Sequence, residues 1–374
     1  MTRPSRVIID TKALKHNFTR IKELAPRSKV MAIIKADAYG HGIVRVAKTL
    51  NNADAFGVAC LEEAEQLRLA SIKAPIILLE GPYKSSDISL IAKLELDVVI
   101  HNKYQLEILE KTKVKGLIKV WLKIDTGMHR LGFASNEVEE VLKRLMSCKN
   151  VHPALILMTH LATANEKDNA LTNQQLDTFK NVSKILHTEK TVANSAAIIN
   201  LPETHLDWVR PGLMLYGVSP LADSFGYNHG LKSVMTLESE IISIQNLSKN
   251  EPVGYGATWR CPENMPVGII AAGYGDGFPR HAKSGTPILV DNVRCPLIGR
   301  ASMDMLTIDL RNQPKTKIGD RVVLWGDSLP IEEVALHADT IPYELLCGVH
   351  KRLQFVERNQ LQDTRIIISM NLYL

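Results

Sequence analysis

Short apolar runs alternate with helical patterns over roughly the first 215 residues, and this alternation constrains the fold more than any other feature of the sequence. Eight β-rich runs separated by helical segments fit a closed (β/α)8 TIM barrel, an α/β fold, better than an open doubly wound sheet. The expected strands are Val30–Ile34, Ala55–Ala59, Ile76–Leu79, Asp97–Ile100, Lys119–Ile124, Ala154–Met158, Thr191–Ala193 and Trp208–Arg210.

The expected helices lie between these strands. The first begins at Asp10 or Thr11, because either side chain is a good N-cap. Its apolar residues recur at three- and four-residue spacing, which predicts one buried face. These residues are Leu14, Phe18, Ile21 and Leu24, and the later helices are expected at Leu61–Ala70, Tyr104–Glu110, Asn136–Met146 and Thr172–Leu186.

The pattern changes after about Leu231, where strand-like runs are interrupted by Gly, Pro and Asn and helical periodicity fades. We therefore expect a barrel domain over residues 1–230 and a separate, mainly β domain over residues 231–374. The strands expected in the second domain are Ser239–Ile244, Val267–Ala272, Thr286–Val290, Met305–Leu310 and Arg321–Trp325, with one short helix near Ile331–His337.

The composition excludes several classes of protein. The net charge of +5 is spread along the chain, so it does not argue for nucleic-acid binding, although a small anionic ligand remains open. The five cysteines form no C-x-x-C pair, which argues against a disulfide framework or zinc site and suits a reducing cytosol. No signal peptide and no run of about 18 apolar residues is evident. We therefore expect a soluble cytoplasmic protein that binds neither nucleic acid nor membrane.

Lys35 ends the first apolar run, and a glycine-containing turn follows it within the stretch Ala32–Gly42. An amine at the exit of a buried strand is desolvated, which favours its neutral form and makes it a candidate for Schiff-base chemistry. An isolated strand-end lysine is more often simply solvated. The rest of the barrel decides between these interpretations.

In a (β/α)8 barrel the chemistry sits at the carboxyl ends of the strands. Those ends are unusually polar here. The strands are predicted from their apolar patterns alone, yet the barrel brings these polar residues together around one mouth. This convergence favours a functional Lys35. The residues at the strand ends are Lys35 followed by Tyr39, Lys123–Arg130, Thr159 with His160, Asn194 with Ser195, and Arg210–Gly212.

The last two strand ends suggest a phosphate site, which is common after strands seven and eight of this fold. Ser195 offers a hydroxyl, and Gly212 lets backbone N–H groups approach an anion closely. An amine for a Schiff base, a phosphate cradle and an arginine able to reach a ring nitrogen together describe pyridoxal 5′-phosphate. Taken alone, Ser195 is as readily explained as part of a helix cap, and His160 as an ordinary buried histidine.

The β domain carries a second cluster of glycine-flanked residues. Tyrosines in such places are exposed at turns with room for a ligand or a partner backbone, or they simply close β-turns. The sequence alone leaves both interpretations open. The segments are Gly254–Trp259, Gly273–Gly277 and Gly299–Met305.

These motifs, in this order over nearly the whole chain, closely resemble those of alanine racemases. The resemblance implies a pyridoxal-phosphate enzyme with a barrel and a C-terminal β domain, assembled as a homodimer. In such an enzyme Lys35, within Ala32–Gly40, corresponds to the lysine that holds the cofactor as an internal aldimine and is one catalytic base. Tyr255, within Gly254–Thr258, corresponds to the second base, which the partner subunit supplies.

The resemblance also assigns the remaining site residues. It places Arg210 at the pyridine nitrogen with His160 bonded to it. It assigns Tyr39, Ser195, Gly212 and Tyr343 to the phosphate, Arg130 and the Met303 backbone to the substrate carboxylate, and Lys123 to a lysine that can be carbamylated. Departures from the family pattern lie at His129, at Ser302 and in the tail beyond about Arg358.

The implied activity is two-base interconversion of L-alanine and D-alanine, which supplies D-alanine for peptidoglycan. A racemase of broader small amino-acid specificity is one alternative. A pyridoxal-phosphate decarboxylase is a second, but such enzymes place an acidic residue where Arg210 stands. A cofactor carrier without catalysis is a third, and the β domain with Tyr255 and Met303 argues against it.

Overall fold

The computed structural model describes residues 3–184 and 186–358. Its contacts divide the chain into two compact units. The barrel unit comprises Asn17–Leu215 and Ser219–Ser224, and the β unit comprises the remaining described residues. Residues 3–16 therefore group with the β unit, although they precede the barrel in the chain.

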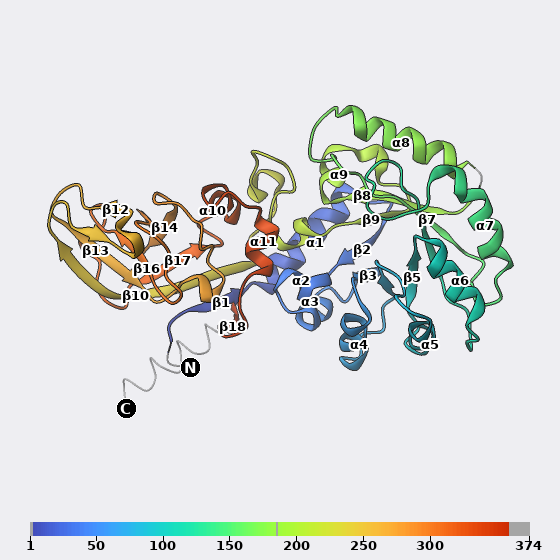
Figure 1. Cartoon of the computed structure of the whole chain (residues 1–374), viewed down its shortest axis with the longest axis horizontal. Coiled ribbons are helices and arrows are strands. Elements are labelled where there is room, and N and C mark those ends of the chain that lie inside the picture. Colours follow the sequence, from blue (N-terminus) through green and yellow to red (C-terminus); the bar gives the residue numbers. More distant parts are fainter. Residues whose placement is uncertain (1–2, 185, 359–374) are drawn as a thin grey trace. The chain divides into compact units, whose positions relative to one another are not determined.

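The barrel unit is a closed ring of parallel strands, which confirms the predicted (β/α)8 architecture (Figure 1). The ring closes because β2 pairs with β3 on one side and with β9 on the other. Most strand residues are buried, as expected for strands covered on both faces. The strands are β2 Lys29–Ile33, β3 Ala55–Val58, β4 Ile76–Leu78, β5 Asp97–Ile100, β6 Val120–Lys123, β7 Ile156–Met158, β8 Glu189–Asn194 and β9 Trp208–Arg210.

Helices lie outside the barrel strands (Figure 1). The predicted start of α1 is confirmed, because Asp10 Oδ1 accepts the backbone N–H groups of Lys12 and Ala13. In the described part of the chain, no helix is both long and apolar enough to cross a membrane. The helices are α1 Thr11–Leu24, α3 Ile43–Thr49, α4 Leu61–Leu69, α5 Ser85–Lys93, α6 Lys103–Lys111, α7 Val138–Ser147, α8 Ala170–Ser183 and α9 Ser195–Asn200.

The turn after β2, assigned as α2 Lys35–Tyr39, winds in the left-handed direction. Ala36–Tyr39 all have φ between 52° and 55°, and Gly40 continues the turn with φ 78°. For L-residues this conformation costs 1–2 kcal/mol each, or about 4–8 kcal/mol for the four non-glycine residues. Backbone bonds hold it, including Ala38 N to Ile34 O at 2.8 Å. His41 Nδ1 adds contacts to the carbonyls of Ala38 and Tyr39. The surrounding structure therefore fixes a turn that its own residues disfavour.

The β unit is built around β10, which is much longer than the expected strand Ser239–Ile244 because it pairs with β1, β13 and β17 along its length. The main sheet has the order β15-β14-β17-β10-β1-β18, with β13 and β16 joined to it through β10. Its strands are β1 Arg6–Ile9, β10 Met235–Leu247, β13 Met265–Ile270, β14 Pro287–Val290, β15 Val293–Pro296, β16 Leu306–Asp309, β17 Arg321–Trp325 and β18 Gln354–Glu357.

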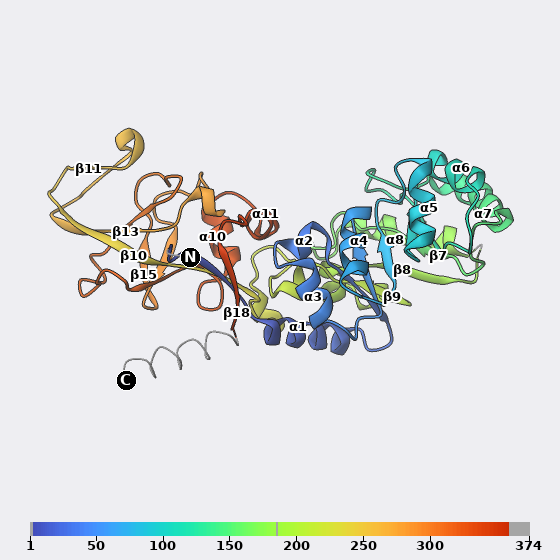
Figure 2. The same cartoon turned by 90° about the horizontal axis from the view of Figure 1, so that it is seen from below.

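A two-stranded ribbon stands out from this sheet (Figure 2). Its strands are β11 Pro252–Val253 and β12 Trp259–Arg260, and Tyr255–Ala257 forms a short 3-10 turn between them. Val253 belongs to a buried cluster with Cys261 and Met265, which anchors the base of the ribbon. The unit also contains α10 Ile331–His337, at the predicted position, and α11 Pro342–Cys347.

Candidate active site

The carboxyl ends of the barrel strands carry the polar residues that the sequence places there. Lys123, Asn194 and Arg210 are the last residues of their strands, and Lys35 and Ser195 begin the short helices after β2 and β8. Because parallel strands share one direction around the ring, these residues surround a single mouth. His160 follows β7 by two residues, and Tyr39, Arg130 and Gly212 lie in the adjoining segments.

Arg210 is buried and clamped by three protein oxygens. Its Nη1 donates to Thr191 Oγ1 at 2.5 Å, and its Nη2 donates to the carbonyls of Thr159 at 2.6 Å and Val192 at 3.1 Å. Burial lowers the pKa of Arg210 to about 10, so the group stays positively charged at neutral pH. The sequence indicated Arg210 but not Thr191, whose hydroxyl holds it only because β8 and β9 are neighbours.

His160 lies beside this guanidinium, with its Nδ1 3.5 Å from Arg210 Nη2. Burial, followed by the positive charge of Arg210, lowers the pKa of His160 well below its usual value, so the ring is neutral. A guanidinium only donates hydrogen bonds, so a bond here requires Nδ1 to accept, whereas the Asn194 amide nitrogen, 3.5 Å from Nε2, would require Nε2 to accept. A neutral ring has one acceptor nitrogen and makes one of these two bonds. Gln175 fixes the backbone, donating to the His160 carbonyl at 3.0 Å and accepting from Ala162 N–H at 2.9 Å.

Tyr39, Ser195 and Gly212 form a compact cradle. Ser195 Oγ accepts the Gly212 N–H at 2.9 Å, which leaves the serine hydroxyl hydrogen to donate elsewhere. A Cβ on Gly212 would lie only 2.6 Å from Tyr39 Oη, so a glycine is needed for this close approach. The combination of hydroxyls and closely approached backbone suits a phosphate group.

Positive charge accumulates at this mouth. Burial and then the cations Arg210, Arg130 and Lys35 lower the pKa of the buried Lys123 to about 8, while Asp125 acts in the opposite direction. Asp125 is itself engaged by the backbone N–H groups of Gly127 and His129, each at 3.0 Å. Three other basic side chains therefore act on Lys123 at this mouth, and their shared positive charge suits an anionic ligand.

Three predicted site residues belong to the β unit, so the barrel cluster does not include them. Tyr255 is 68% exposed in the 3-10 turn between β11 and β12. Met303 is 54% exposed, and its carbonyl accepts the Gly275 N–H at 2.9 Å. Tyr343 lies in α11. Their roles at the active site remain predictions from the resemblance.

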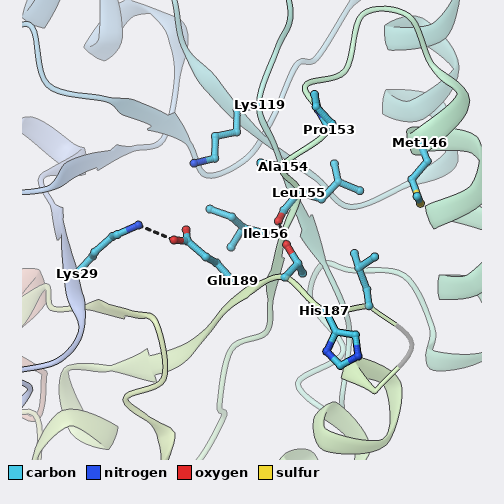
Figure 3. A pocket seen from close by; sticks show the side chains of 11 residues that line it. Lys29, Lys119, Met146, Pro153, Ala154, Leu155, Ile156, His187 and Glu189 are labelled. Carbon is cyan, nitrogen blue, oxygen red and sulfur yellow. Dashed lines mark hydrogen bonds and ion pairs between the residues drawn. The ribbon is translucent and has the colours of Figure 1, made fainter.

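A cavity of about 390 Å³ lies at the opposite, amino-terminal end of the barrel strands (Figure 3). Lys29 Nζ lies 2.5 Å from Glu189 Oε1, and Trp208 Nε1 donates to Glu189 Oε2 at 2.8 Å. In this cavity the Lys29 amine therefore already has the Glu189 carboxylate as its partner. None of the predicted site residues lines this cavity.

The chain matches two family models, one for the alanine racemase N-terminal domain over residues 9–220 and one for the alanine racemase C-terminal domain over residues 234–357. The chain belongs to the alanine racemase family. A relative named alanine racemase from Nitrosococcus oceani is 53% identical over 350 residues, covering 93% of this chain and 98% of the relative.

Solved structures of this family agree with the fold. The biosynthetic alanine racemase from Pseudomonas aeruginosa superposes with a TM-score of 0.93 at 42% identity, covering 95% of this chain and 99% of that one. The Bartonella henselae alanine racemase, described with covalently bound pyridoxal phosphate, has a TM-score of 0.85 at 27% identity and covers 95% of this chain and 99% of its own. The predicted family is therefore confirmed.

Proposed function

We propose that this chain interconverts L-alanine and D-alanine and that its product supplies peptidoglycan synthesis from the cytoplasm. Membership of the alanine racemase family supports the reaction. The single structural observation that carries the proposal is the buried guanidinium of Arg210, clamped by a hydroxyl and two carbonyls at the mouth that also presents Lys35.

The barrel mouth fits pyridoxal 5′-phosphate, because the Tyr39–Ser195–Gly212 cradle suits its phosphate and the excess positive charge suits its anionic form. Lys35 would hold the cofactor covalently, and Tyr343 would add to the phosphate site. When bound, the cofactor would supply an electron sink for the charge left when a substrate loses its Cα proton.

Arg210 limits that sink. Its guanidinium donates hydrogen bonds but keeps its protons at neutral pH, so it would not protonate a pyridine nitrogen. A weaker sink favours simple return of the proton over transamination or loss of carbon dioxide. The decarboxylase alternative needs an acidic residue at this position, where the chain has Arg210.

Two bases on opposite faces of Cα are the economical arrangement for racemisation. Lys35 would remove or return the proton on one face, and Tyr255 of a second copy would act on the other. Arg130 and the Met303 backbone would hold the substrate carboxylate. The exposed position of Tyr255, in a ribbon that stands out from its own sheet, supports a role in a homodimer.

We further propose that Lys123 is carbamylated. A pKa of about 8 leaves a fraction of this amine neutral near neutral pH, and neutral amines add carbon dioxide with release of one proton. The resulting carbamate is an anion, which Arg130, Arg210 and Lys35 would stabilise. Mass spectrometry of intact protein in bicarbonate, compared with Lys123→Met, tests this addition.

The test of the main proposal is Cα–H exchange into deuterated water with L-alanine and, separately, with D-alanine. Exchange with inversion is expected in the wild type. Tyr255→Phe should lose exchange from one enantiomer far more than from the other, because only one face loses its base. Equal slowing for both enantiomers would contradict the face assignment. Release of carbon dioxide would support the decarboxylase instead.

A further inference from the structure

Glu63 bridges the exits of two neighbouring barrel strands. Its Oε1 accepts the Ala36 N–H at 2.6 Å, and its Oε2 accepts the Ala59 N–H at 2.8 Å. Ala36 is the residue directly after Lys35, and Ala59 directly follows β3. We propose that Glu63 is a positioning residue that fixes the direction in which Lys35 leaves β2. The kinetic part of this inference rests on the proposed racemase function.

The carboxylate continues a strand ladder that the backbone cannot continue. The last ladder bond between β2 and β3 is Ile34 N–H to Gly57 O at 2.9 Å. In a parallel ladder the next two bonds would run from Ala59 N–H to Ile34 O and then from Ala36 N–H to Ala59 O. The chain has by then entered its left-handed turn, and the Glu63 carboxylate takes the Ala36 N–H instead.

The simplest alternative is that Glu63 only serves its own helix. It is the third residue of α4, and an acceptor there commonly binds N–H groups at the helix start. The Ala59 contact fits that ordinary role. The Ala36 contact does not, because it reaches 27 residues back along the chain to another strand exit. The bond to Ala36 therefore distinguishes a positioning role for Glu63 from simple capping of α4.

The contact between Glu63 and Ala36 holds the start of the left-handed turn. Ala36 is the first residue of the left-handed turn, which four non-glycine residues adopt against their preference. Without an acceptor for its N–H, this residue can relax towards ordinary helical angles. Such a change would redirect both Lys35 before it and Tyr39 after it, so the amine and the phosphate cradle would lose their common geometry.

Glu63→Gln and Glu63→Ala test the inference in the full-length protein. Glutamine keeps one oxygen and so one of the two bonds, whereas alanine keeps neither. Glu62→Gln is the matched control, because it removes the same charge from the same helical turn and Glu62 has no contact with Ala36 among the described interactions. The readouts are amide hydrogen exchange at Ala36 and Ala59, cofactor attachment to Lys35 by borohydride reduction and peptide mass spectrometry, and steady-state kinetics.

We expect faster exchange at Ala36 in both Glu63 variants. We also expect slower cofactor attachment, with kcat lowered about 10-fold by Glu63→Gln and about 100-fold by Glu63→Ala, because small misplacements of a reacting group have effects of this size. KM should change little. Glu62→Gln should match the wild type in all three.

Faster exchange at Ala59 alone, with unchanged attachment and kcat, would overturn the inference and leave Glu63 as a helix cap. If the wild type attached the cofactor but did not racemise alanine, the proposed function would fail. The exchange and attachment measurements would still decide the role of Glu63.

Discussion

The two mouths of the barrel use the same kind of residue in opposite ways. At the amino-terminal mouth Lys29 pairs with Glu189, and the aromatic face of Trp208 lies 5.1 Å from the Lys29 amine. At the carboxyl-terminal mouth the positive charges of Arg210, Arg130 and Lys35 lower the pKa of Lys123, and Asp125 opposes them only in part. A mouth that neutralises its own charge serves stability. A mouth that leaves positive charge unbalanced is prepared for an anion from outside.

The difference also appears in what holds each cation. Arg210 is fixed by Thr191 and two carbonyls, which orient the guanidinium without neutralising it. Glu189 instead neutralises Lys29 in a partly exposed pair, where solvent weakens the interaction. Holding a buried guanidinium in place without a counter-charge lowers the free energy of unfolding. Substitutions at the two mouths should therefore differ in their effects on stability and on activity.

Lys35→Ala should have the largest effect, because it removes both the covalent attachment point and one proposed base. We expect the racemisation rate to fall by about 10⁴-fold, the upper range for loss of a proton-transfer group. The cofactor's visible absorption from its lysine-bound form should disappear as well. Retention of that absorption would place the attachment at another lysine.

Lys123→Met should stabilise the folded protein at neutral pH. Because folding lowers the pKa of Lys123 from 10.5 to about 8, the charged form is penalised in the folded state. This penalty is fully present below pH 8 and is relieved as pH rises towards 10.5. We expect Lys123→Met to raise the free energy of unfolding by about 3 kcal/mol at pH 7, with the gain vanishing by about pH 10.5. Chemical denaturation in buffer free of carbon dioxide, from pH 7 to 10.5, measures it; parallel curves for the two proteins would contradict it.

Thr191→Val keeps the shape of the side chain but removes the acceptor of Arg210 Nη1. Leaving a buried charged donor unsatisfied should lower the free energy of unfolding by about 2 kcal/mol and shift the absorption of bound cofactor. Thr172→Val is the control, because it removes a hydroxyl pair with Thr163 without a contact to Arg210. Thermal unfolding and absorption spectra of both variants make the test. Identical spectra in the two would argue that Thr191 does not orient Arg210.

Glu189→Gln should have the smallest effect. The amide oxygen can still accept the Trp208 N–H, and only the exposed ion pair with Lys29 is lost. We expect a loss of less than about 1 kcal/mol in the free energy of unfolding and unchanged racemisation. A clear fall in kcat would show that the two mouths are coupled and would break the comparison.

The sequence predicted the barrel and the side chains at its mouth because both depend on local pattern. Lys35 and Arg210 were indicated by their places at strand ends, and those places are confirmed. The sequence pattern did not predict the segment in which the backbone departs from ordinary helical or strand angles. Ala36–Tyr39 contains no glycine, and Asp37 alone is of a residue type that adopts left-handed angles readily, so the sequence did not indicate this turn.

Contacts between neighbouring barrel strands could not be predicted from the sequence either. Thr191 and Glu63 act through residues that only strand pairing brings near, so neither carried a signal of its own. In the β unit, β1 was missed because its four residues are too short to show a period. The roles of Tyr255, Met303 and Tyr343 stay predictions, because these residues belong to the other unit of the chain.

The sheet of the β unit joins the two ends of the chain, since β1 pairs with β10 and also, in parallel, with β18. This connection imposes an order on biosynthesis. At typical translation speeds β1 emerges on the order of half a minute before β18, whereas every strand of the barrel is made in the interval between them. Once β9 has left the ribosome, and before β18 has done so, the nascent chain should therefore carry a closed barrel while β1 still lacks its β18 partner and is open to protease. The first strand to be made is thus among the last to be fully paired.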